Sequence, residues 1–247
     1  MGMPITVEVV GISHPEPIEK VFGYFRAVDE RFSTYKDSSE ISKINRGEIN
    51  ADAYSAQMRE VFAIAEMTKQ ETDGYFDIEL PLASPMAGLR PRDPSGIVKG
   101  WAIKNAADLL RADGFKDFYI ETGGDIASSG KNSDGKEWSV GIRNPFNRNE
   151  IVKIIFPRGA GMATSGSYER GAHIYNPHSP GDKLDEIVSI TVIGPDVLEA
   201  DRFATAAFAM GKTGIEFLEE RSNFEAYAID KNGMATYTSG FDNFTRP

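Results

Sequence analysis

The chain has 247 residues, of which 40% are hydrophobic and 26% are charged, with a net charge of −10 at pH 7. This length can bury the core of one large domain or of two small ones, and the acidic balance argues against a nucleic-acid-binding protein, which needs a basic face. The absence of cysteine excludes disulfides, zinc–thiolate sites, iron–sulfur clusters and thiol nucleophiles.

The first residues, MGMPITVEVVG, alternate apolar and polar side chains and predict a strand. They lack the basic region and the long apolar region of a signal peptide. No run of about 18 apolar residues follows, so we expect no membrane span. These features predict a cytoplasmic protein.

Two amphipathic helices are predicted next, over residues 17–31 and 55–72, because apolar residues recur in both at helical spacing. Residues 32–47 between them are polar and rich in turn-forming residues. Ser38 or Ser39 can cap a short helix in this segment.

Two groups of aromatic residues are candidates for contact with a flat ligand. Tyr35 lies in the polar segment, where a half-buried surface position is an equally good interpretation. Gly74 ends the second helix, and Tyr75, Phe76 and Asp77 follow at the start of a short predicted strand. Adjacent aromatic residues belong more often to the core and its rim, so this signal is weak by itself.

Residues 93–130 predict a helix, a strand and a double-glycine turn. Asp93 is a good N-cap, and Pro94 suits the first helical position. The apolar spacing predicts that the helix buries one face, and Gly114 can take the left-handed conformation that ends it.

The entrance to this helix gathers residues that suit a phosphate group. Asp93, Ser95, Gly96 and Lys99 lie where backbone N–H groups have no partner within the helix and where the helix dipole is positive. An ordinary cap beside a solvated lysine is the more frequent interpretation of such a stretch. The segment is neither a P-loop nor a GxGxxG dinucleotide motif.

The second half of the chain mixes strands and helices without regular βαβ alternation, which indicates the α+β class and one domain over residues 1–247. Residues 161–182 are rich in Gly, Ser and Pro and predict a functional loop. It contains His173, for which a structural role is somewhat more frequent than catalysis, and His178, expected to be exposed. The other predicted elements cover residues 138–142, 151–156, 187–193, 195–210, 214–220 and 227–238.

Asp201 and Thr205 share one face of the helix predicted over 195–210, because they lie four residues apart. A carboxylate and a hydroxyl are hard oxygen ligands that suit Mg²⁺ better than zinc. A solvated aspartate beside a threonine bonded to its own helix remains an alternative.

Eight motifs in order resemble the ApbE family of flavin transferases, the FAD:protein FMN transferases. They are FSTYKDSSEISKIN, GYFDIELPL, DPSGIVKGWAIKNAADLL, TGGDIASSG, EWSVGIRNP, MATSGSYER, HIYNP and DRFATAAFAMG. The resemblance covers nearly the whole chain and implies an α+β fold of mixed sheets and packed helices, with an FAD cleft between the halves.

The resemblance implies a Mg²⁺-dependent enzyme that splits FAD, attaches FMN to a Thr or Ser of an acceptor flavoprotein and releases AMP. It places Mg²⁺ on the Asp201 and Thr205 side chains and on the Gly96 and Ala204 carbonyls. On chemical grounds we expect His173 to be the general base, because a base works best near the operating pH, with Asp201 as the second catalytic residue. FAD contacts are implied for Tyr35, Tyr75, Phe76, Asp77, Asp93, Lys99, His173 and Ile174.

Two alternatives stay open at this stage. One is an FAD pyrophosphatase that passes FMN to water, and the other is a non-catalytic FAD-binding protein. Family acceptors are typically modified in a short segment similar to Ser/Thr-Gly-Ala-Thr, but the sequence does not name the acceptor or the oligomeric state.

Overall fold

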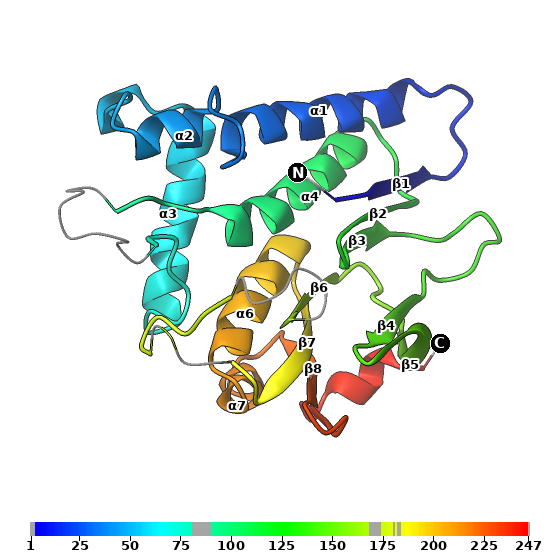
Figure 1. Cartoon of the computed structure of the whole chain (residues 1–247). Coiled ribbons are helices and arrows are strands. Elements are labelled where there is room, and N and C mark those ends of the chain that lie inside the picture. The colour runs from blue at the N-terminus through cyan, green and yellow to red at the C-terminus, as the bar shows by residue number, and fades with distance from the viewer. Residues whose placement is uncertain (1–2, 81–89, 168–173, 180, 182–183, 247) are drawn as a thin grey trace.

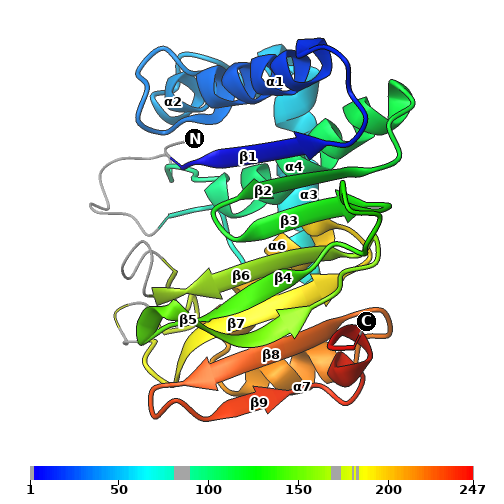
Figure 2. The same cartoon turned by 90° about the vertical axis from the view of Figure 1, so that its right-hand side faces the viewer.

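A seven-stranded antiparallel sheet organises the molecule, with strand order β1-β2-β3-β6-β7-β8-β9. The computed structural model describes residues 3–80, 90–167, 174–179, 181 and 184–246. Helices cover one face of the sheet, and the β4–β5 hairpin covers part of the other (Figures 1 and 2). This arrangement confirms the predicted α+β class.

The strands and helices have the following bounds. The strands are β1 Ile5–Val9, β2 Phe118–Thr122, β3 Asp125–Ser129, β4 Val140–Asn144, β5 Asn147–Ile155, β6 Gly161–Gly166, β7 Ile187–Gly194, β8 Glu225–Asp230 and β9 Ala235–Tyr237. The helices are α1 Glu16–Phe32, α2 Glu40–Asn45, α3 Ala56–Glu71, α4 Ser95–Ala112, α6 Val197–Ala209 and α7 Thr213–Glu219.

Several predicted ends and turns are confirmed. Ser39 caps α2, where its Oγ accepts from the backbone N–H of Ser42 at 3.1 Å. Gly74 and Gly114 take left-handed φ values of +80° and +89° at the ends of α3 and α4. The tail forms the expected hairpin, in which Tyr227 pairs with Tyr237.

The predicted loop over residues 161–182 is wrong at its start, because residues 161–166 form β6 in the middle of the sheet. The small residues there are needed for packing. A Cβ on Gly161 would lie 2.0 Å from the backbone of Asp196 and Val197, where α6 begins. The close passage of β6 beneath the start of α6 therefore requires small residues, and a sequence rich in such residues resembles a loop.

Two further expectations are corrected. The strand expected after Gly74 does not form, since the backbone there makes only an isolated bridge between Glu79 and Arg92. The helix α4 is buried around most of its circumference, including Ile97 and Trp101, because it contacts α1, α3, α6, β2 and β3. A single buried face was too narrow an expectation for a helix inside a layer of helices.

Candidate functional site

The first turn of α4 forms one side of the candidate site. Its N-cap is Pro94, one residue later than predicted. Asp93 still serves the helix entrance, because its Oδ1 accepts from the backbone N–H of Ser95 at 3.0 Å. The backbone N–H of Asp93 donates to the carbonyl of Ile78 at 2.8 Å, which ties the entrance to the segment after α3.

A buried cluster of charges joins α4 to α6 and β3. The Nζ of Lys99 lies 2.8 Å from Oδ2 of Asp125 and 3.5 Å from Oδ1 of Asp201. The backbone N–H of Gly100 donates to the other oxygen of Asp201 at 2.8 Å. Asp125 is fully buried and Asp201 is 2% exposed, so the interpretation of Asp201 as a solvated surface residue is wrong.

The charges in this cluster do not balance, because two carboxylates share one ammonium. Burial raises the pKa of the Asp125 carboxyl well above its ordinary value, and the nearby charge of Asp201 raises it further. Lys99 and the backbone N–H of Thr164 act in the opposite direction. A second cation at this point would favour the ionised form of both carboxyl groups.

Gly96 and Thr205 bring the two predicted halves of the metal site together. A Cβ on Gly96 would lie 3.6 Å from Cγ2 of Thr205 and 3.0 Å from the ring of Phe76. One turn later, a Cβ on Gly100 would lie 2.7 Å from Cβ of Asp201. The glycines therefore allow α4 and α6 to approach closely, and residues about 100 positions apart in sequence share one site.

The aromatic segment after α3 is only partly available to a ligand. Phe76 is 4% exposed and packs on Gly96, whereas Tyr75 is half-buried with its ring 4.5 Å from that of His178. The Oδ2 of Asp77 pairs with Lys69 at 2.8 Å. Phe76 thus supports the helix entrance with its ring, and Tyr75 stays partly exposed.

The remaining predicted residues lie in different surroundings. Tyr35 is 97% exposed and stands apart from the buried charge cluster. Ala204 is fully buried within α6, and Ile174 packs against the apolar cluster around α6 and β7. His178 is exposed, as expected. His173 lies outside the described residues.

Sequence reasoning did not place Asp125 in the site. The available signal was a carboxylate immediately after the Gly123-Gly124 turn, at the first position of a strand. The pairing of Asp125 with Lys99 depends on how β3 packs against α4, which residue spacing does not reveal. Asp125 lies closer to the Lys99 ammonium than Asp201 does, at 2.8 Å against 3.5 Å.

These segments are matched by a family model described as "ApbE family", over residues 1–84 and 90–228. The chain belongs to the ApbE family. A protein named FAD:protein FMN transferase from Haemophilus influenzae is 25% identical over 279 residues, covering 90% of this chain and 81% of that protein. A protein of the same name from Salmonella typhimurium is 26% identical over 304 residues, covering 100% and 85%.

Solved structures share the fold of this ApbE family member. The flavin transferase ApbE from Vibrio cholerae matches with a TM-score of 0.84 at 24% identity, covering 99% of this chain and 96% of that one. The apo form of the Pseudomonas stutzeri flavinyl transferase ApbE matches with a TM-score of 0.83 at 22% identity, covering 100% and 95%.

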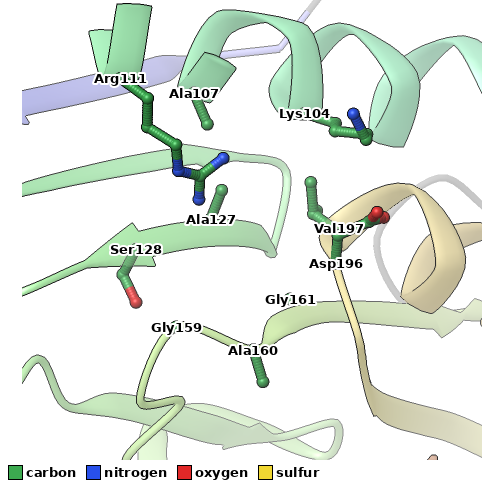
Figure 3. A pocket seen from close by; sticks show the side chains of 10 residues that line it. All are labelled: Lys104, Ala107, Arg111, Ala127, Ser128, Gly159, Ala160, Gly161, Asp196 and Val197. Carbon is green, nitrogen blue, oxygen red and sulfur yellow. The ribbon is translucent and has the colours of Figure 1, made fainter. Parts of the chain in front are cut away.

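Two hollows in this ApbE family member lie away from the charge cluster. One, of about 20 Å³, is bordered by Lys104 and Arg111 of α4 and by Asp196 at the start of α6 (Figure 3). It has room for about one water molecule. The other, of about 370 Å³, lies beside Tyr24 and Trp101 between α1, α3 and α4. Neither is bordered by a residue predicted to contact the flavin.

The described residues of the family member hold no group of three or more acidic or histidine side chains placed to bind a metal. A cation in the predicted position would therefore need backbone oxygens, a hydroxyl and oxygens of a bound ligand besides one carboxylate. None of the described helices is long and apolar enough to cross a membrane.

Proposed function

We propose that this chain is an FAD:protein FMN transferase that attaches FMN to a Thr or Ser hydroxyl of an acceptor flavoprotein and releases AMP. The observation that carries the proposal is the convergence of the family's segments on one site, with Lys99 of α4 between Asp125 of β3 and Asp201 of α6. Two relatives that carry this enzyme name align along 81% and 85% of their lengths.

The reaction is a phosphoryl transfer that balances without a redox partner. The acceptor oxygen forms a bond to the phosphorus on the FMN side of FAD, and the bond from that phosphorus to the bridging oxygen breaks. AMP leaves with the bridging oxygen, and the hydroxyl proton passes to a base. His173 is our candidate for that base, because an imidazole exchanges protons near neutral pH.

Mg²⁺ is the metal that we propose, held by the side chains of Asp201 and Thr205 and by the carbonyls of Gly96 and Ala204. The donors fit, because all are hard oxygens. In a regular helix the N–H of Gly100 donates to the carbonyl of Gly96. Here the N–H of Gly100 donates to Oδ2 of Asp201 at 2.8 Å, so it is shared between Asp201 and the Gly96 carbonyl. The Gly96 oxygen therefore keeps a lone pair for a cation. The bound metal would supply Lewis acidity at the diphosphate.

Lys99 has a positioning and charge-balancing role in this proposal. Its ammonium lies between Asp125 and Asp201 and compensates one of their two negative charges. It also stands one turn from Gly96, at the helix entrance where phosphate oxygens are favoured. Lys99 can therefore hold Asp201 in place and add positive charge near the diphosphate.

In this proposal the flavin lies beside the segment that follows α3, in a cleft between the two halves of the molecule. We assign contacts to Tyr75, Asp77, Asp93 and Ile174, with Phe76 supporting them from below, and a further contact to Tyr35. The half-buried position of Tyr75 supports the assignment, since a partly exposed aromatic ring can contact a flat ligand.

One assay separates the proposal from its two alternatives. The protein is incubated with FAD, Mg²⁺ and a short synthetic peptide that carries Ser-Gly-Ala-Thr, the segment implied by the family resemblance. Flavin fluorescence that stays on the peptide after denaturation means transfer. Release of FMN and AMP without labelling means an FAD pyrophosphatase, and unchanged FAD means a binding protein, so either result would overturn the proposal.

A further inference from the structure

Exposed apolar side chains gather on two neighbouring hairpins. Seven large hydrophobic side chains are exposed among the described residues, and five of them lie on the β4–β5 and β8–β9 hairpins. We call these five residues the hairpin patch: Phe146, Ile151, Ile154, Met234 and Tyr237. Their exposed fractions run from 46% to 67%.

The turns of the two hairpins touch each other. The ring of Phe146, in the β4–β5 turn, lies 3.8 Å from the position of a Cβ on Gly233, in the β8–β9 turn beside Met234. Farther along, the Nζ of Lys153 lies 5.8 Å from the ring centre of Tyr237. The patch is therefore continuous across the two hairpins.

The outward face of the β4–β5 hairpin carries two exposed isoleucines among its polar residues. Its inward residues, such as Ile142 and Ile155, are buried against the sheet. On the opposite side, Ile154 pairs with Gly141, and Ile151 packs over the same glycine. A hairpin with one buried face normally carries polar residues on the other, so these isoleucines indicate a contact surface.

The charge of this hairpin differs in sign from that of the chain. Residues 140–155 contain three basic residues and one acidic residue, a net charge of +2, whereas the whole chain carries −10. Two copies that met through the β4–β5 hairpin alone would place like charges opposite each other, which is unfavourable. A partner that complements this hairpin in charge and hydrophobicity is a protein with an apolar surface and an acidic rim.

The hairpin turns point toward the same end of the strands as the β2–β3 turn before Asp125, whereas the candidate site lies on the helix-covered face of the sheet. The end of β8 at Asp230 pairs with Ile187 at the start of β7, and the end of β6 at Gly166 pairs with Ser189. The β2–β3 turn points toward this edge, because β3 runs antiparallel to β6, but the pairing of Ile126 with Met162 sets Asp125 back from the edge. Figure 2 shows both hairpin turns on the side of the sheet where β6 and β8 end.

We propose that the hairpin patch docks the folded acceptor protein. The acceptor contributes an apolar surface with an acidic rim, which lies next to its target hydroxyl. This inference rests on the proposed transferase function, because a protein substrate needs contacts beyond the few residues that enter the site. Phe146 and Ile154 are the anchors, and the exposed Arg143 faces the acidic rim. Docking would raise the local concentration of the target segment at the site.

The test compares a peptide with folded acceptors. The same Ser-Gly-Ala-Thr segment is used as a free peptide and in a surface loop of a small carrier protein, flanked by Asp and Glu or by Lys. Phe146→Ser combined with Ile154→Ser should lower kcat/KM for the acid-flanked carrier by about 10-fold or more, as loss of two anchors predicts, and leave the peptide rate unchanged. Met67→Ser, at an exposed apolar residue on α3, is the matched control.

Each other outcome is decisive. If the unaltered protein labels neither peptide nor carrier, the transferase function fails. If it labels the peptide and the patch variant modifies both carriers at normal rates, docking fails while the function stands. Loss of peptide labelling in the variant, or equal use of acid- and Lys-flanked carriers by the unaltered protein, also overturns docking. Patch-dependent pelleting with phosphatidylserine vesicles, or patch-dependent dimers in sedimentation, would assign the surface to lipid or to a second copy.

Discussion

The backbone N–H of Gly100 donates to Oδ2 of Asp201 at 2.8 Å, across 101 residues of sequence. This bond joins α4, which carries the predicted phosphate-binding entrance, to α6, which carries the predicted metal ligands. It forms because the glycine has no side chain to separate the helices. The site therefore depends on a close helix–helix contact as well as on its charged groups.

Gly100→Ala should damage both stability and activity. The added Cβ would lie 2.7 Å from Cβ of Asp201 and 2.9 Å from the carbonyl of Val197. Overpacking of this kind costs about 1–3 kcal/mol of unfolding free energy. Displacement of Asp201 should also raise the Mg²⁺ concentration that half-maximal FAD turnover needs. Urea unfolding and a Mg²⁺ titration measure the two effects.

A glycine with space around it provides the control for this change. Gly23 lies within α1, and the nearest atom to its added Cβ is an Arg26 nitrogen at 3.8 Å. Gly23→Ala should therefore raise the unfolding free energy by about 0.5–1 kcal/mol through helix propensity. Equal effects at the two glycines would contradict a special role for the α4–α6 contact.

Arg202 connects α6 to α3, whose end leads into the predicted flavin segment. Its guanidinium pairs with Glu199 and Glu71, and its Nη1 donates to Oγ1 of Thr68 at 3.3 Å. Arg202→Met should lower the unfolding free energy by about 2 kcal/mol, below the ~3–5 kcal/mol expected when an orphaned charge stays buried. The reason is that the side chain of Glu71 is 42% exposed.

The same variant tests whether Arg202 positions the flavin segment. We expect a higher KM for FAD with a smaller change in kcat, because the end of α3 would lose its anchor on α6. Arg202→Lys should restore part of both properties, since it keeps the charge but not the forked geometry. Arg111→Met, which removes a half-exposed pair with Asp108, is the control. A loss of stability with an unchanged KM would limit Arg202 to a structural role.

The sequence was sufficient where structure follows from local pattern. The extents of β1, α3 and the tail hairpin come from side-chain alternation, helical spacing and turn residues, which act over a few neighbours. It was insufficient for β6, whose glycine and small side chains are selected by the passage of α6 above it. The Lys99–Asp125 pair was missed for a similar reason, because packing between α4 and β3 creates it.

Removal of the metal ligand provides the next prediction. Asp201→Asn keeps the size of the side chain and removes the one carboxylate in the proposed Mg²⁺ set. Loss of an outer-shell partner of a metal typically costs 10–100-fold, so loss of this ligand should lower kcat by at least about 100-fold. Turnover of FAD across a Mg²⁺ titration measures it, and EDTA should stop the unaltered enzyme without changing its circular dichroism. Asp108→Asn, at a surface carboxylate of α4, should retain activity. Full turnover in Asp201→Asn would remove the residue from the metal site.

Lys99 and Asp125 offer a double-mutant cycle that separates charge balance from packing. Lys99→Met leaves two buried carboxylates without their shared ammonium and should cost about 3–5 kcal/mol of unfolding free energy. Asp125→Asn alone should cost less, because Lys99 keeps Asp201 at 3.5 Å. In the double variant one of the two uncompensated charges is gone, so its loss of unfolding free energy should be smaller than the sum of the two single losses by about 1–3 kcal/mol. Urea unfolding of all four proteins measures this coupling. Strict additivity would mean that the ammonium does not compensate Asp125, and the account of Lys99 as the charge-balancing residue would have to be abandoned.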